Sequence, residues 1–237
     1  MGVFQEMLLA ARIHLRPMVL IASLPHNDPE LAKAALDGGA DMIKLHINLS
    51  HHASGTRFGT LAEESPAIER IVHIWEGKPV GIVPGAKPEL NDRTMAALPG
   101  LGIKFVSLYL HHASAGALPP FEKIDRMLAL GFEDGPEIAE SLDCLPIQAC
   151  ELSILHPDTY GQPLTYHDIA RYAAAARRTK LPLVVPTQHR IPPESTADLL
   201  NIGVSAVMIG SIVAGDTPNE WLQTTSAFRK AMDENWK

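Results

Sequence analysis

The chain has 237 residues, of which 46% are hydrophobic and 20% charged, and this predicts a globular protein with a substantial core. Its net charge of -7, with no block of like charges, argues against nucleic acid as a ligand, because such binding normally needs a basic face. No run of about eighteen apolar residues and no signal-peptide pattern occurs, so we expect a cytoplasmic protein without a membrane span. Its two cysteines are too few for a disulfide framework. We therefore expect a small-molecule ligand.

Short apolar or β-branched runs alternate along the chain with longer segments of helical period. This pattern is typical of successive βαβ units around a parallel sheet. We predict strands at 17–23, 41–47, 79–84, 104–110, 146–152, 182–187 and 206–211. We predict helices at 28–39, 65–77, 165–179 and 193–203. Asp, Ser or Thr opens several of these helices and Gly closes several, as helix caps require.

An eighth strand at 126–132 would close a (β/α)8 barrel, whose typical length of about 250 residues fits this chain. The alternative is a long helix through this segment, because Phe121, Ile124 and Leu128 fit one helical face, and it would leave an open, doubly wound parallel sheet. No Pro-, Gly- or Ser-rich linker divides the chain. We therefore predict a closed TIM barrel as a single domain over residues 1–237.

Strand alternation predicts which side chains enter this barrel, because the opposite set must pack against the surrounding helices. In the second strand the apolar set is Ile43, Leu45 and Ile47, so the inward set is Lys44, His46 and Asn48. In the fourth strand Val106, Leu108 and Leu110 form the apolar set, and the inward set is Ser107, Tyr109 and His111. Polar side chains are thus expected at the mouth of the barrel, where barrel enzymes carry their active sites.

The tetrapeptide His-His-Ala-Ser occurs twice, at 51–54 and 111–114, each time after a predicted strand. The copies lie two strands apart, whereas a duplicated half-barrel would relate strands four apart, so we do not interpret them as a repeat. Alternation directs His111 inward, whereas His51 and His52 fall in a polar loop. We therefore expect His111 to matter more for activity than His51 or His52.

Histidines are concentrated after predicted strands, where eight of the eleven occur: His26, His46, His51, His52, His111, His112, His156 and His189. Together with Glu151 or Asp28 they could bind zinc, manganese or iron. No H-x-H or H-x3-H pair lies on a predicted strand or helix, however. We therefore expect proton transfer and substrate binding, without a metal or redox cofactor, and keep a divalent metal as the alternative.

The C-terminal stretch "GVSAVMIGS" (203–211) is the most specific signal in the sequence. It resembles the eighth strand of the phosphate-binding barrels of the ribulose-phosphate-binding superfamily, and "DPELAKAALDGGADMIKL" (28–45) resembles their first helix and second strand. This superfamily includes N-acetylmannosamine-6-phosphate 2-epimerase and the histidine-biosynthesis isomerase barrel. The resemblance implies that the backbone amides of Gly210 and Ser211 bind a substrate phosphate beside a short helix.

Two departures from that superfamily affect the predicted site. The usual glycine after the seventh strand is replaced by "PTQHRI" (186–191), so Gln188, His189 or Arg190 could reach the anion instead. The Lys and Glu of the epimerases are absent from the corresponding positions, so their mechanism does not transfer.

Lys44 and Glu151 are the strongest ionisable candidates at strand ends, and such a pair suits carbonyl chemistry. Glu151 lies on the opposite face from Gln148 and Cys150, and which face is inward stays open. We predict catalytic roles for Lys44, His46, His111 and Glu151 in an isomerase, epimerase or lyase for a small phosphorylated carbonyl or sugar compound. The alternatives are a non-catalytic ligand-binding barrel and a metal-dependent lyase or aldolase. A homodimer is a further expectation that the sequence does not decide.

Overall fold

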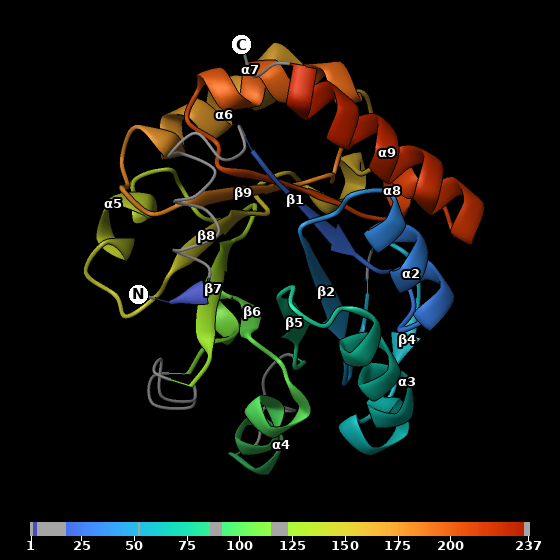
Figure 1. Ribbon diagram of the computed structural model, residues 1–237. Helices are drawn as coiled ribbons and strands as arrows, with labels where there is room; N and C mark the ends of the chain where they lie inside the picture. Colours follow the sequence, from blue (N-terminus) through green and yellow to red (C-terminus); the bar gives the residue numbers. More distant parts are fainter. Residues whose placement is uncertain (1, 4–17, 52, 86–91, 115–122, 235–237) are drawn as a thin grey trace.

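A computed structural model of the chain describes residues 2–3, 18–51, 53–85, 92–114 and 123–234. Within them, parallel strands form a closed barrel in the order β1-β10-β9-β8-β7-β6-β5-β2 (Figure 1). The barrel strands are β1 (Val19–Ser23), β2 (Met42–His46), β5 (Val80–Val83), β6 (Phe105–Tyr109), β7 (Asp125–Leu130), β8 (Ala149–Leu152), β9 (Leu183–Pro186) and β10 (Ala206–Ile209). Closure follows because β1 pairs with both β10 and β2.

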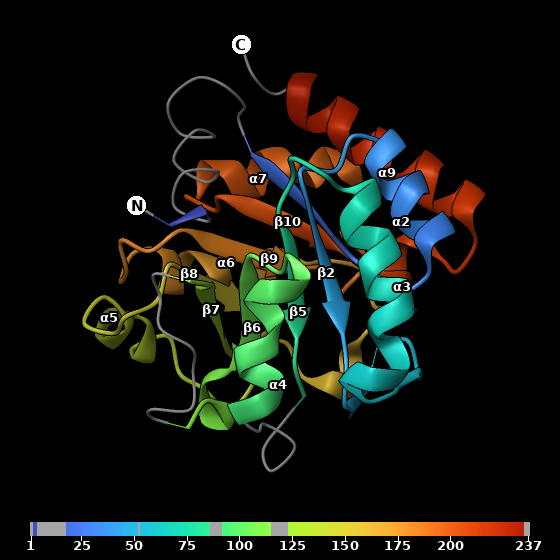
Figure 2. The same ribbon diagram turned by 60° about the horizontal axis from the view of Figure 1, so that its bottom comes forward.

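Helices surround this barrel, and Figure 2 shows several of them against its outer side. They are α2 (Pro29–Asp37), α3 (Leu61–Ile74), α4 (Asp92–Ala97), α5 (Ile138–Leu142), α6 (Tyr166–Ala176), α7 (Thr196–Asn201), α8 (Ser211–Ala214) and α9 (Pro218–Glu234). Short 3₁₀ turns are η1 (Leu98–Leu101), η2 (Leu110–His112), η3 (Pro157–Thr159) and η4 (Pro193–Ser195). A small antiparallel ladder of β3 (Leu49–Ser50) and β4 (Arg57–Phe58) lies between β2 and α3.

The predicted barrel is confirmed, including its eighth strand. The segment 126–132 contributes β7, which pairs with β6 and β8, so both the long helix and the open doubly wound sheet are wrong. Leu128 lies in β7 opposite Leu108 and Cys150, while Phe121 lies outside the described residues. The apolar pattern of this segment fitted both structures, and pairing with strands on both sides decided between them.

Local capping chemistry explains where the predicted helices begin. The side chain of Asp28 accepts a hydrogen bond from the Glu30 amide at 2.7 Å, and a proline follows it at the first helical position. Thr60 and Glu63 form a reciprocal capping box that starts α3 before the predicted position 65. Thr165 forms the equivalent box at α6.

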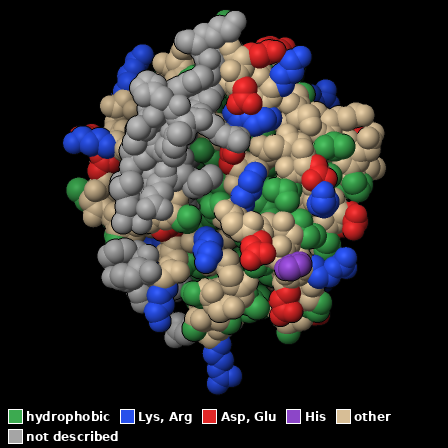
Figure 3. Space-filling view, in the orientation of Figure 1, with side chains coloured by type: hydrophobic (Ala, Val, Ile, Leu, Met, Phe, Trp, Pro, Cys, Tyr) green, Lys and Arg blue, Asp and Glu red, His purple; other side chains and the backbone are tan. Residues whose placement is uncertain are grey.

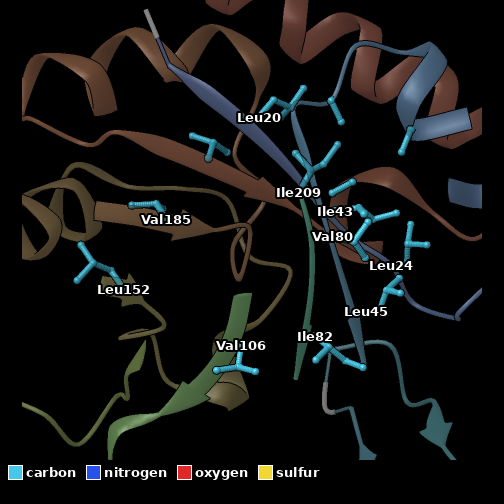
Figure 4. Packing of buried hydrophobic residues seen from close by; sticks show 14 of the residues in the cluster. Leu20, Leu24, Ile43, Leu45, Val80, Ile82, Val106, Leu152, Val185 and Ile209 are labelled. Atoms are coloured by element: carbon cyan, nitrogen blue, oxygen red, sulfur yellow. The ribbon is translucent and has the colours of Figure 1, made fainter. Parts of the chain in front are cut away.

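The buried apolar residues form two layers, separated by the barrel wall, as alternation predicts. The outer layer lies between strands and helices and includes Ile43, Leu45 and Val106, which Figure 4 shows. Leu108 belongs to the same layer. The inner layer fills the barrel and consists of Val19, Ile21, Met42, Phe105, Met127, Ala149, Val184, Ala206 and Met208. A Cβ at Gly81 would lie 2.1 Å from the Phe105 ring, so this glycine makes room for it. The interior is therefore a packed core, and the space for a ligand lies above it.

Candidate active site

A pocket of about 260 Å³ lies at the C-terminal mouth of the barrel. Each barrel strand contributes at least one lining residue; in chain order, one from each strand is Ser23, Lys44, Val83, Ser107, Ala129, Glu151, Pro186 and Met208. Drug-sized ligands occupy pockets of about 300 Å³ or more, so this one suits a smaller molecule.

Lys44 and Glu151 form a buried ion pair at this pocket. The Lys44 Nζ lies 3.2 Å from Glu151 Oε2, and each side chain is only 7% exposed. The two residues come from β2 and β8, which are not neighbours in the barrel, so the pair crosses its interior. The face of Glu151 is thereby decided: it lines the pocket, while Cys150 belongs to the outer layer. Burial raises the pKa of the Cys150 thiol to about 12, which leaves this cysteine unreactive.

Two serine hydroxyls hold the Glu151 carboxylate in place. Ser107 donates to Oε2 at 2.9 Å, and Ser153 donates to Oε1 at 2.9 Å. Both oxygens are therefore engaged, and Lys44 adds a charged partner to one of them. Alternation had placed Ser107 inward, whereas Ser153 was missed. Ser153 follows the last residue of β8, so strand alternation could not assign its direction.

His46 is a buried, neutral imidazole in the wall of the pocket. Burial lowers the pKa of His46 well below its usual value, and the nearby His51 and Lys44 lower it further. The ring packs against His51 and Phe58, with centroid distances of 4.7 and 4.8 Å. Its Nδ1 has no hydrogen-bond partner among the described residues. His46 therefore contributes a neutral imidazole ring to the pocket wall. Its inward direction agrees with the prediction from strand alternation.

Two tyrosines and a glutamine form another polar part of the wall. The Gln188 amide donates to the Tyr160 hydroxyl and accepts from the Leu155 amide at 3.1 Å. Burial raises the pKa of both Tyr109 and Tyr160, and the charge of Glu151 adds to this effect. Both phenols are therefore protonated at neutral pH and can take part in hydrogen bonds with a ligand.

The predicted phosphate site is only partly assembled in the pocket. Gly210 and Gln188 line it, but the Gly210 amide already donates to the Thr187 hydroxyl at 3.0 Å. The Ser211 hydroxyl contacts the Ala53 carbonyl at 3.4 Å. Arg190 is exposed and does not line the pocket. Thr187 is a buried lining residue that was not predicted from the sequence, although it directly precedes Gln188 at the end of β9.

The inward direction predicted for His111 and Asn48 is wrong, because both strands end earlier than expected. β6 ends at Tyr109, and η2 turns the chain so that His111 is exposed and His112 lines the pocket. Asn48 follows the end of β2 with φ 54° and donates to the Pro84 carbonyl at 3.1 Å. His51, which was expected in a polar loop, lines the pocket; His52 lies outside the described residues.

A buried histidine beside the pocket connects three segments of its wall. His189 Nδ1 lies 3.1 Å from Asp168 Oδ2, and its Nε2 lies 2.9 Å from Thr159 Oγ1. His189 directly follows Gln188, and Thr159 directly precedes Tyr160. The contacts therefore fix the backbone next to the Tyr160–Gln188 hydrogen bond, which makes His189 a positioning residue for that wall.

Three broader properties concern metals, membranes and surface charge. Within the described part of the chain, no three side chains of His, Cys, Asp or Glu are grouped to hold a metal ion. No helix among these residues is long and apolar enough to cross a membrane. On the face shown in Figure 3, acidic and basic side chains are interspersed rather than gathered into one patch.

The fold and the site define the class of protein. The chain is a (β/α)8 barrel with a polar pocket at the carboxyl ends of its strands, the position at which barrel enzymes carry their active sites.

Solved structures share this architecture at low sequence identity. Tryptophan synthase from M. tuberculosis superposes with a TM-score of 0.74 at 14% identity, over 98% of each chain. Thiamine phosphate pyrophosphorylase from Pyrococcus furiosus gives 0.63 at 13% identity, over 93% of this chain and 98% of that one.

A third neighbour is (S)-3-O-geranylgeranylglyceryl phosphate synthase from Thermoplasma acidophilum, solved with sn-glycerol-1-phosphate. It gives a TM-score of 0.61 at 14% identity, over 99% of each chain. No family model and no curated protein matches the sequence. These neighbours share the closed (β/α)8 barrel that was predicted for this chain.

Proposed function

We propose that this protein is an isomerase or lyase that transfers a proton in a small phosphorylated carbonyl compound, without a redox cofactor. The observation that carries the proposal is the Lys44–Glu151 pair, because it places a carboxylate and an ammonium group 3.2 Å apart in the wall of a pocket. Burying two charges costs free energy, and a buried pair of opposite charges in the wall of a cleft therefore suggests a functional site.

The proposed reaction gives each charged group one task. Glu151 removes a proton from the carbon next to the substrate carbonyl, and Lys44 stabilises the negative charge that develops on the carbonyl oxygen. Ser107 and Ser153 keep the carboxylate oriented during this transfer. Return of the proton to another carbon or face gives an isomer or epimer. In a lyase reaction Glu151 would instead remove the proton of a hydroxyl group on the carbon β to the carbonyl; the bond between the α and β carbons would break, an aldehyde would leave, and Lys44 would stabilise the enolate until it is protonated.

The proposed phosphate position is the end of the pocket lined by Gly210 and Thr187, next to Ser211, the first residue of α8. The Gly210 amide donates to Thr187 Oγ1, which leaves the hydroxyl hydrogen of Thr187 able to turn toward an anion. Two of the structural neighbours are named after phosphorylated compounds, thiamine phosphate and a glyceryl phosphate, which supports this choice of substrate class. Lys44 is the only lysine or arginine among the described lining residues, so neutral donors would provide most of the anion contacts.

Deuterium exchange tests proton removal whatever the product of the reaction is. The protein would be incubated in D2O with a panel of triose, tetrose and pentose phosphates, and loss of carbon-bound hydrogen followed by proton NMR. We expect exchange with at least one compound, and a decrease of about 10²–10⁴-fold in Glu151→Gln. The matched control, Glu140→Gln, changes an exposed carboxylate in α5 and should keep the wild-type rate. Equal exchange in Glu151→Gln and wild type would refute the assignment of the base.

A further inference from the structure

A second cavity, of about 220 Å³, lies on the outer side of the barrel, beside α6. Its lining residues are Leu130, Asp134, Pro136, Ile154, His167, Ala170, Arg171, Ala174 and Ala175. The proposed reaction uses none of them. Strand alternation explains its place at β7, where Ala129 lines the mouth pocket and the next residue, Leu130, lines this outer cavity. Just beyond the end of β8, Ser153 lines the mouth pocket and Ile154 the outer cavity.

Small side chains and a short helix leave this space open. α5 has only five residues, and three alanines of α6 line the cavity: Ala170, Ala174 and Ala175. Alanine side chains fill little of the space between a helix and a sheet. Leu130, Ile154 and Ala175 are nearly completely buried, so the floor of the cavity is apolar.

The rim of the cavity carries charges of both signs. Arg171 and His167 are four residues apart on α6 and therefore share a face. Arg171 is half-buried, and no described residue forms a hydrogen bond or ion pair with its guanidinium. Asp134 enters the same cavity from the loop after β7, where its Oδ2 accepts a hydrogen bond from the Gly131 amide at 2.7 Å. No ion pair among the described residues joins Asp134 to Arg171, so both charged groups are available to bind a ligand.

We propose that this outer cavity binds a small zwitterion with an apolar body, such as an apolar α-amino acid. Arg171 would bind the carboxylate, Asp134 the ammonium group, and the apolar floor the side chain. A ligand with only a negative charge would be repelled by Asp134, and one with only a positive charge would be repelled by Arg171. The rim therefore favours a ligand that carries both charges. The site is separate from the mouth pocket, and the inference does not depend on the proposed reaction.

Titration calorimetry of the full chain tests this inference with three matched compounds. L-Leucine carries both charges, 4-methylpentanoate lacks the ammonium group, and 3-methylbutylamine lacks the carboxylate. We expect leucine to bind at least about tenfold more tightly than either analogue, because each charged hydrogen bond contributes that much. Arg171→Gln should weaken leucine binding about tenfold and leave the amine unaffected, and Asp134→Asn should weaken leucine binding but not that of the acid.

Two further variants separate binding from folding. Arg177→Gln removes an exposed arginine at the end of the same helix and should leave leucine binding unchanged. Ala174→Phe should fill the cavity and abolish binding while the melting temperature is retained. The inference is wrong if wild type shows no saturable leucine binding up to about 10 mM. It is equally wrong if the analogues bind as well as leucine, or if Arg171→Gln and Arg177→Gln bind it equally.

Discussion

The two copies of His-His-Ala-Ser occupy different places in the molecule, although their sequences are identical. The first follows β2, and its His51 packs 4.7 Å from His46 in the pocket wall and bonds Ser54 Oγ at 2.9 Å. The second follows β6, and its first histidine, His111, is exposed. The β3–β4 ladder brings His51 to the pocket, whereas η2 leaves His111 exposed and brings His112 to the pocket. The same four residues therefore acquire different environments from the turns that precede them.

The largest effect on activity is expected from Lys44, which lies in β2, the strand that precedes the first tetrapeptide. Lys44→Ala should abolish activity, and it should also cost about 3 kcal/mol of stability, because it leaves a buried carboxylate unpaired. This differs from a purely catalytic lysine, whose removal would leave the melting temperature unchanged. Urea unfolding measures this loss of stability in Lys44→Ala. The double variant Lys44→Met with Glu151→Leu removes both charges and should recover most of the stability.

Borohydride reduction in the presence of substrate then separates two roles of Lys44. Covalent trapping at Lys44 would mean an imine intermediate, whereas an untrapped but essential lysine would act through its charge.

A smaller effect separates the two tetrapeptides directly. We expect His51→Ala to lower activity about tenfold, because it removes a ring from the pocket wall and exposes His46. His111→Ala should stay within about twofold of wild type, since its side chain is exposed and does not line the pocket. Its ring stacks on that of Tyr109, which does line the pocket, with a centroid distance of 5.4 Å. Parallel assays of the two folded variants measure the difference. A larger loss of activity in His111→Ala than in His51→Ala would contradict this prediction. It would mean that the loop after β6 covers the pocket when substrate is bound.

The smallest effect is the pH dependence of stability that His46 confers. Its pKa is lowered in the folded protein, whereas the unfolded chain has the ordinary value of about 6.5, so below that pH the unfolded state binds the additional proton. Stability should therefore fall on acidification below pH about 6.5, by up to about 1.4 kcal/mol per pH unit from this group. Urea midpoints at pH 7 and 5.5 should differ less in His46→Asn than in wild type. An identical difference in both proteins would contradict a buried neutral His46.

The sequence predicted the barrel more completely than the site. All seven strands predicted from apolar runs, and the helices around 28–39 and 165–179, occur where periodicity and caps placed them. Lys44, His46, Ser107 and Tyr109 line the pocket as alternation predicted. Alternation failed where a strand ended, as at His111, because a period of two has no meaning beyond the last paired residue.

Local chemistry therefore indicated the order of strands and helices along the chain, the approximate helix starts and which residues of a strand share a face, although it left open which face of β8 is inward. These properties depend on neighbours two to four residues away, so a single sequence contains them. Three contacts were decided by the tertiary structure alone. Lys44 pairs with Glu151, which lies 107 residues later, and the Gly210 amide donates to the Thr187 hydroxyl. His51 lines the pocket. These contacts arise only when the barrel closes and brings the ends of distant strands to one mouth, where side chains compete for the same partners.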